Sequence, residues 1–385
     1  MYIVAPFGFY GWGNIGDEAT LNGFARLLAQ GSVAARVRVG SRDPGHTARV
    51  EPAFRYFSVS RRDPRRWWAK LRASAHAVIG GTPIMDVLGR WPLCDLEPLV
   101  RSTDRWKVPM VFIGVGIESL RSAESRSIVS KEIVPRVRHW SVRSDCDRQR
   151  LTEYGASPDH ITVAADMAWL IEPATPEFGR GYLRANGVDP HQRLIGVNVV
   201  NENFVLDREA GMVDALALAL EELADQLDAR IVFLANEIRD DAEFDRMAAE
   251  RVRGRMKDPH RAVLAANTYL APREMMSIVS CCDLTISMRY HFCLFSALQK
   301  VPFIAIPRSD KIADLCWDLG WRSTVMPPAL ERATIVDEGV RLHQDASLIR
   351  SQLSKSVGRM SERAKRNLDA LEALAPVGRQ PSGVR

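Results

Sequence analysis

The sequence predicts an α/β protein made of two doubly wound, Rossmann-like domains. Short apolar runs alternate with stretches whose apolar residues recur at helical spacing, as parallel βαβ units require. This alternation stops once, in a Pro- and Gly-containing stretch at residues 172–190, and then resumes. The length of 385 residues also exceeds that of one ordinary domain. Two domains with a boundary near this stretch follow from these observations.

The first unit centres on residues 7–21, FGFYGWGNIGDEATL. Residues 2–5 are uncharged and predict a buried strand, and a helix is expected to follow with Asn14 as its cap. Three glycines of the intervening loop allow positive φ: Gly8, Gly11 and Gly13. Free N–H groups and the helix dipole point out of such a turn, so we expect it to hold an anion. A dinucleotide is not favoured, because no ribose-binding acid follows a clear second strand.

Asp17 and Glu18 lie in the first turn of this helix. Two carboxylates at a helix N-terminus stabilise the helix dipole, and this purely structural role is one interpretation. The functional interpretation is that one of them activates a hydroxyl group of a substrate.

The rest of the first half continues the alternation. We expect strands at residues 36–40, 77–79, 108–116 and 139–142, and a loop at residues 42–48. Gly80 and Gly81, the glycine pair at 114 and 116, and Arg143 follow these strands directly. Because functional loops of parallel sheets lie at the carboxyl ends of the strands, these residues are expected to share one edge with the opening loop.

The second half repeats the pattern with strands at 194–200, 229–235, 283–287 and 301–306. Helices are expected at 212–227, at 240–252 and from residue 289 onward. Amphipathic helices are expected beyond residue 340, and the last ten residues predict a disordered tail. The predicted division is therefore 1–175, 190–340, a helical segment at 341–375 and a tail at 376–385.

Composition excludes several classes of protein. With 46% hydrophobic and 26% charged residues, the chain has the composition of a soluble globular protein. It has no apolar run of 18 residues and no signal-peptide pattern, so we expect a cytoplasmic protein. The net charge of +5 is too small and too scattered to indicate a nucleic-acid partner. Six cysteines without C-x-x-C or zinc spacing predict no metal site.

Several segments together resemble the polysaccharide pyruvyltransferase family. Residues 9–21, FYGWGNIGDEATL, resemble its N-terminal signature, and residues 141–143, SVR, resemble its arginine segment together with Leu151 and Gly155. Residues 286–291, ISMRYH, resemble its arginine and histidine segment, which residues 302–311 complete. The resemblance covers residues 1 to about 320.

The resemblance implies a GT-B-like arrangement of the two domains, with the active site in the cleft between them. It implies transfer of the pyruvyl group of phosphoenolpyruvate to hydroxyls of a glycan or lipid-linked sugar, with formation of a pyruvate ketal and release of phosphate. The first domain would then serve the acceptor and part of the anion site, and the second domain phosphoenolpyruvate. No cofactor beyond the donor substrate is implied.

The resemblance also assigns roles to residues. Arg289 and Arg143, with Lys311 as a third cation, would bind the donor's phosphate and carboxylate, for which the guanidinium fork is suited. His291 would protonate the methylene carbon, and Asp17 would act as the base, with Glu18 and Asp166 as the next choices. Further substrate-binding positions are Asn14, Gly13, Gly16, Gly80 and Gly81.

Two other functions stay open. A glycosyltransferase with a nucleotide-sugar donor uses the same architecture, and Glu274 could bind its ribose. A non-catalytic, glycan-binding family member is the second, because Thr82 stands where the family has glycine and Ser144 where it commonly has aspartate. Residues 236–237 and 240–241 are interpreted as a solvated helix start in preference to a part of the cleft.

Residues 61–72, RRDPRRWWAKLR, combine basic residues with two adjacent tryptophans. A helix from Pro64 to about Ser74 with this composition is typical of contact with an anionic membrane surface. The alternative is that Trp67 or Trp68 packs into the first domain while the arginines are solvated. The acceptor sugar and the oligomeric state stay open, with a homo-oligomer as one option.

Overall fold

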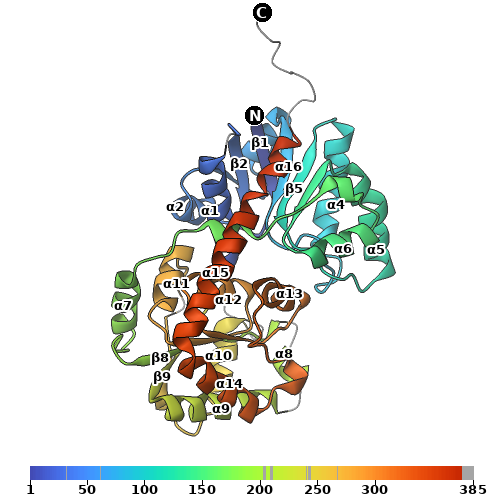
Figure 1. Cartoon of the computed structure of the whole chain (residues 1–385). Coiled ribbons are helices and arrows are strands. Elements are labelled where there is room, and N and C mark those ends of the chain that lie inside the picture. The colour runs from blue at the N-terminus through green and yellow to red at the C-terminus, as the bar shows by residue number, and fades with distance from the viewer. Residues whose placement is uncertain are drawn as a thin grey trace, which may run out of the picture.

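The computed structural model describes residues 1–374 apart from 32, 61, 203–204, 209–210, 240, 242–243 and 267. Two parallel sheets form two lobes, and the chain returns to the first lobe at its C-terminal end (Figure 1). The predicted pair of Rossmann-like domains is confirmed by this topology.

In the described part of the first lobe, seven parallel strands lie in the order β3-β2-β1-β4-β5-β6-β7. Their bounds are β1 Tyr2–Phe7, β2 Arg36–Ser41, β3 Arg55–Ser58, β4 Ala75–Ile79, β5 Met110–Val115, β6 His139–Val142 and β7 Ile161–Val163. The helices between them are α1 Ile15–Gln30, α2 Pro44–Val50, α3 Pro64–Arg72, α4 Leu93–Arg105, α5 Ala123–Ile128 and α6 Asp145–Glu153. The two central strands β4 and β5 are buried at every residue, which explains why their sequences are apolar except for His76.

The loop expected at residues 42–48 is wrong, because α2 begins there. The side chain of Asp43 accepts a hydrogen bond from the His46 N–H at 2.9 Å and caps the helix. Pro44 occupies the first helical position, where its missing N–H and fixed φ are no disadvantage. The Pro and Gly of this stretch therefore start a helix instead of preventing one.

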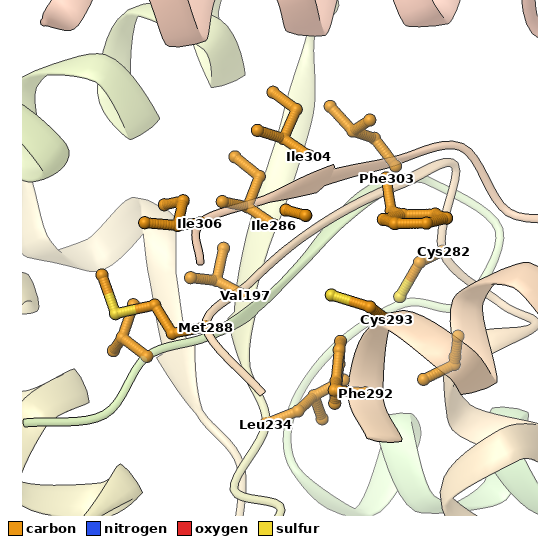
Figure 2. Packing of buried hydrophobic residues seen from close by; sticks show 14 of the residues in the cluster. Val197, Leu234, Cys282, Ile286, Met288, Phe292, Cys293, Phe303, Ile304 and Ile306 are labelled. Carbon is orange, nitrogen blue, oxygen red and sulfur yellow. The ribbon is translucent and has the colours of Figure 1, made fainter. Parts of the chain in front are cut away.

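The second sheet has five parallel strands among the described residues, in the order β10-β9-β8-β11-β12. The strands are β8 Arg193–Asn198, β9 Ala229–Phe233, β10 Ala262–Leu264, β11 Leu284–Ser287 and β12 Phe303–Ala305. The helices are α7 Pro176–Ala185, α8 Val205–Arg208, α9 Met212–Leu227, α10 Asp245–Arg253, α11 Pro272–Val279, α12 Tyr290–Leu298 and α13 Asp310–Leu319. Figure 2 shows Val197, Ile286 and Ile304 side by side on neighbouring strands and, elsewhere in the same buried cluster, Phe292 and Cys293 of α12. This core fixes the start of α12 and the residues that precede it.

Helix α7 occupies the stretch expected to join the domains, and it packs against the second lobe. Gly179 makes this contact close, since a Cβ there would lie 2.2 Å from the carbonyl oxygen of Ser277. The Gly179 N–H also donates to the Ser277 hydroxyl at 2.8 Å. The second lobe thus begins with α7, before β8.

The chain ends with three helices, α14 Arg332–Gln344, α15 Ala346–Lys365 and α16 Leu368–Glu372. Helix α15 runs from the second lobe to the first, and α16 lies there beside β5 (Figure 1). Between them, the side chain of Asn367 donates to the carbonyl of Ala165 at 2.8 Å and accepts from the Ser141 hydroxyl. The predicted tail at 376–385 lies outside the described residues.

No helix among the described residues is long and apolar enough to cross a bilayer. The strand order reverses between β1 and β4 in the first sheet and between β8 and β11 in the second. Ligand crevices of doubly wound sheets lie at such points, beyond the carboxyl ends of the strands. The loops after these four strands are therefore where a site is expected.

Candidate active site

A cavity of about 700 Å³ lies between the two lobes at the carboxyl ends of their strands. Seven residues predicted from the sequence line it: Asn14, Asp17, Gly81, Arg143, Arg289, His291 and Lys311. They come from the loops and first helical turns that follow β1, β4 and β6 in the first lobe and β11 and β12 in the second. The four others do not line it: Gly13, Gly16, Glu18 and Gly80.

The loop before α1 is held by the second lobe. The Ile15 N–H donates to the Asn236 carbonyl at 3.0 Å, and the Ile238 N–H donates to the Gly13 carbonyl at 2.9 Å. The side chain of Asn14 accepts from the Gly16 N–H at 2.9 Å, as the predicted cap should. The N–H groups of Ile15 and Gly16 belong to the turn that was expected to bind an anion, and both are already hydrogen-bonded within the protein. The loop therefore joins the lobes instead of presenting these N–H groups to the cavity.

Close packing accounts for three of the glycines outside the cavity. A Cβ at Gly16 would lie 2.2 Å from Nδ1 of His291, one at Gly80 2.0 Å from Cγ2 of Thr20, and one at Gly13 2.7 Å from Ile238. Gly16 therefore makes room for the His291 ring, in place of the predicted ligand contact.

Glu18 points away from the cavity and is fully buried. Its carboxylate accepts from the Gly11 N–H at 2.8 Å, the Tyr269 hydroxyl at 2.9 Å and the Thr47 hydroxyl at 3.3 Å. Burial raises the pKa of this carboxyl. The contacts make Glu18 an anchor for the loop, and they correct its predicted role as a substrate ligand.

Asp166 connects two of the predicted functional residues across the lobes. Its Oδ2 lies 3.0 Å from Nη2 of Arg143 and 3.3 Å from Nε2 of His291. Although burial opposes ionisation, Arg143 and His291 lower the pKa of Asp166 to about 2. A fully buried carboxylate thus holds the Arg143 guanidinium and the His291 ring in one arrangement.

His291 sits in the first turn of α12 and is nearly buried, with 11% of its side chain exposed. Burial lowers its pKa, which the Asp166 carboxylate partly opposes. Its Nε2 also lies 3.3 Å from the Thr20 hydroxyl. The imidazole is therefore oriented by the first lobe although α12 belongs to the second.

Arg289 is less available than the sequence suggests. Its guanidinium contacts Asp245 at 2.5 Å, Glu237 at 3.1 Å and Glu202 at 3.2 Å. Burial alone would lower the pKa of Arg289, but these carboxylates raise it. Three carboxylates already neutralise this arginine, so it serves first to hold the loops after β8, β9 and β11 together.

Two neighbouring cations are better placed for a ligand. Nζ of Lys311 has a loose ion pair with Glu118 at 3.9 Å, and burial lowers the pKa of this lysine. Arg308 pairs with Glu202 at 2.7 Å and was not singled out from the sequence, although it lies in the segment that completes the family resemblance. Glu202 itself carries no motif that would have marked it.

Asp17 faces the cavity from the first turn of α1. Burial and the nearby carboxylate of Glu237 raise its pKa to about 8. Glu237 is only 1% exposed and lines the same cavity, so the predicted solvated helix start at residues 236–237 is wrong. Both carboxyl groups line the cavity, one from each lobe, while Asp240 lies outside the described residues.

An aromatic wall also lines the cavity. We use this name for Phe9, Trp12 and Trp91. The rings of Trp12 and Trp91 stack with centroids 5.5 Å apart, and Phe9 meets Trp91 edge-on at 5.4 Å. The guanidinium of Arg42 lies 3.5 Å from the centre of the Trp12 ring. The sequence prediction missed this wall because Trp91 lies far along the chain, in no periodic element.

A family model for polysaccharide pyruvyl transferases matches residues 14–310. The chain belongs to the polysaccharide pyruvyl transferase family. The matched part of the chain includes five residues that line the cavity: Asn14, Asp17, Arg143, Arg289 and His291. Lys311, which also lines the cavity, follows directly after the matched part. A sequence comparison with curated proteins found no match.

Solved structures share the fold at low sequence identity. A putative UDP-N-acetylglucosamine 2-epimerase from Listeria monocytogenes superposes with a TM-score of 0.67 at 10% identity, covering 99% of this chain and 98% of that one. A glycosyltransferase from Rickettsia africae gives 0.63 at 10% identity, with coverage of 98% and 99%. Anabaena Alr3699/HepE in complex with UDP-glucose gives 0.64 at 12% identity, with coverage of 97% and 99%. These similarities establish the GT-B-type arrangement predicted from the sequence. Because the sequence identity is so low, they are evidence for the fold alone.

The described residues contain no candidate metal site, and Glu274 lies outside the cavity. Among the described residues no group of His, Cys, Asp or Glu could hold a metal ion. Glu274, considered above as a ribose ligand, accepts from the Ala271 N–H at 2.7 Å and caps α11 outside the cavity. Its carboxylate is thus already used in the fold.

Proposed function

We propose that this member of the family transfers the pyruvyl group of phosphoenolpyruvate to hydroxyls of a glycan or lipid-linked sugar. The observation that carries the proposal is the meeting of Arg143, His291 and Lys311, from both lobes, at one cavity. Aromatic side chains line the same cavity. A small, strongly anionic donor and a sugar acceptor fit these two sets of side chains.

The donor would lie against Arg143, Lys311 and Arg308. Phosphoenolpyruvate carries a phosphate and a carboxylate, and guanidinium groups bind both as bidentate partners. Lys311 adds a point charge whose present partner, Glu118, is 3.9 Å away and easily exchanged. Arg289 would support this set indirectly, by keeping Glu202 and Glu237 in place.

His291 would deliver the proton to the donor's methylene carbon. Burial lowers its pKa in the free protein, and a bound anion favours the imidazolium form, so donor binding itself would load the acid. Asp166 would hold the ring by its Nε2 and offset the positive charge. Asp166 is a positioning residue in this scheme, because it does not touch the reacting atoms.

Asp17 would accept the proton of the attacking hydroxyl. With a pKa of about 8, roughly a tenth of Asp17 is ionised at pH 7, but that fraction is a stronger base than an ordinary carboxylate. Its place on the cavity wall, next to Glu237, favours it over Glu18, which points elsewhere. Activity is therefore expected to rise with pH toward about 8.

The reaction balances without a redox partner or metal. Protonation of C3 leaves positive charge at C2, which one sugar hydroxyl attacks as its proton passes to Asp17. The C2–O bond to phosphate then breaks, and a second hydroxyl of the sugar attacks C2 as its proton passes to the departing phosphate. Two C–O bonds and one C–H bond form, one C–O bond and the C=C π bond break, and the proton taken by Asp17 makes up for the one given to C3. The products are a cyclic pyruvate ketal and inorganic phosphate.

The aromatic wall would bind the acceptor. Sugar rings present apolar C–H faces that pack on aromatic side chains, and ligand pockets typically combine such surfaces with a few polar groups. Trp91 is the expected platform, because Trp12 is already covered by Arg42 and by Trp91 itself.

Turnover tests the proposal. The protein is incubated with phosphoenolpyruvate and a panel of nitrophenyl and lipid-linked glycosides, and both phosphate and acceptor mass are followed. The proposal expects phosphate release together with a pyruvyl mass increment on at least one acceptor. Transfer of a sugar from a nucleotide sugar under the same conditions, with no use of phosphoenolpyruvate, would replace it by the glycosyltransferase alternative.

A further inference from the structure

The outer surface of α3 carries large apolar side chains among its basic residues. Asp63 caps this helix, and Ala69 is the residue that the core takes from it. Trp67, Trp68 and Leu71 are 49%, 63% and 70% exposed. The alternative that Trp67 or Trp68 packs into the first lobe is therefore wrong. The fold leaves much of these three large apolar side chains exposed to solvent.

A basic groove lies next to this surface. Five arginines and Trp68 line it, together with small and apolar residues and with no Asp or Glu among the lining residues. The arginines are Arg36, Arg38, Arg55, Arg65 and Arg72. Arg65 pairs with Asp63 at 3.1 Å, while the other four form no ion pair within the described part of the chain. The groove measures about 1590 Å³, against about 700 Å³ for the active-site cavity, so it suits an extended anionic surface better than a single small ion.

The groove and the cavity lie at opposite ends of the first sheet. Tyr2, Arg36 and Arg55, which line the groove, stand at the starts of β1, β2 and β3. The cavity lies at the carboxyl ends of the strands. In Figure 1 the start of β1 is at the end of the first lobe that faces away from the second. A partner on this face would leave the cavity free.

We propose that this face, the basic groove with Trp67, Trp68 and Leu71, docks on an anionic lipid bilayer. Tryptophan and leucine side chains enter the headgroup region, and the arginines meet lipid phosphates. A second copy of this chain does not fit, since two such faces would oppose arginines to arginines with no acidic partner in the groove. A nucleic acid would satisfy the charge but would leave Leu71 exposed.

Flotation of the full chain with liposomes tests the proposal. Phosphatidylcholine vesicles are compared with vesicles that also contain phosphatidylglycerol, at low and at high salt. We expect recovery with the anionic vesicles at low salt and its loss at high salt. Each arginine contributes roughly five-fold in partitioning, so Arg36→Ser/Arg55→Ser/Arg72→Ser should weaken binding on the order of 100-fold.

A matched variant, Arg105→Ser/Arg184→Ser/Arg322→Ser, removes three arginines from other surfaces and should float like the wild type. The pair Trp68→Ser/Leu71→Ser should weaken anionic binding while keeping its salt dependence, because the arginines are retained. Equal loss in both triple variants would reduce the effect to net charge and overturn the proposal. Negligible recovery of the wild type with all vesicles would also overturn the proposal. An RNA gel shift, or a dimer in light scattering, that is lost only in Arg36→Ser/Arg55→Ser/Arg72→Ser would overturn it as well.

Discussion

Asp17 provides a direct test of how the site is built, through the substitution Asp17→Asn. Burial and Glu237 raise its pKa from 3.8 to about 8. In the folded protein the carboxyl therefore keeps its proton up to about pH 8, whereas in the unfolded chain it loses it near pH 3.8. Folding takes up a proton between these values, so the stability of the wild type falls as the pH rises through this range.

The size of this effect follows from the shift. A difference of about 4 pKa units corresponds to about 6 kcal/mol as an upper limit above pH 8. Asp17 is only half-buried and the cavity admits water, so about 2–3 kcal/mol is the realistic expectation. The asparagine side chain carries no charge at any pH, and Asp17→Asn should accordingly be more stable than the wild type at high pH while losing pyruvyl transfer.

Urea unfolding of both proteins near pH 5 and above pH 8 measures the difference. The gain from Asp17→Asn should be small at the lower pH and reach its full size at the higher one. Asp337→Asn, at an exposed position on α14, is the control and should show no such trend. Equal stability of Asp17→Asn and the wild type at both pH values would refute the reasoning.

Three further outcomes are expected. His291→Gln keeps the approximate shape of the side chain but cannot deliver a proton, so turnover should fall at least ~100-fold in phosphate-release assays while calorimetry still detects phosphoenolpyruvate binding. Gly23→Ala places a Cβ 1.8 Å from a main-chain carbonyl oxygen and should cost about 1–3 kcal/mol in thermal or urea unfolding. Gly181→Ala, with no atom within 4 Å of its Cβ in α7, should be neutral or stabilising in the same measurement. Trp91→Ala should raise the acceptor KM roughly ten-fold with donor affinity unchanged, whereas Trp106→Ala, at an exposed tryptophan, should do neither.

Much of the fold could be predicted because its signals are local. Helix α9 spans residues 212–227 and strand β6 residues 139–142, the ranges that apolar periodicity indicates. The lining of the cavity by Arg143, Arg289 and His291 follows from the same logic, since each lies just after a strand and parallel strands end at one edge.

The remaining features depend on contacts between distant parts of the chain. The pairing of Arg289 with Glu202 and Glu237 joins loops after three strands, and no spacing in the sequence encodes it. Glu18 looks like a cavity residue in the motif, yet Tyr269 of the second lobe binds it on the other side of α1. The return of α16 to the first sheet through Asn367 likewise has no local signal.

The central claim is that the cationic side of the cavity binds phosphoenolpyruvate. Calorimetric titration of the wild type with phosphoenolpyruvate and, separately, with UDP-glucose tests it most directly. We expect binding of phosphoenolpyruvate, weakened by about 2–4 kcal/mol in Lys311→Met and unchanged in Lys131→Met, where the lysine is exposed on another surface. Binding of UDP-glucose without any of phosphoenolpyruvate, or equal phosphoenolpyruvate affinity in Lys311→Met, would contradict the account.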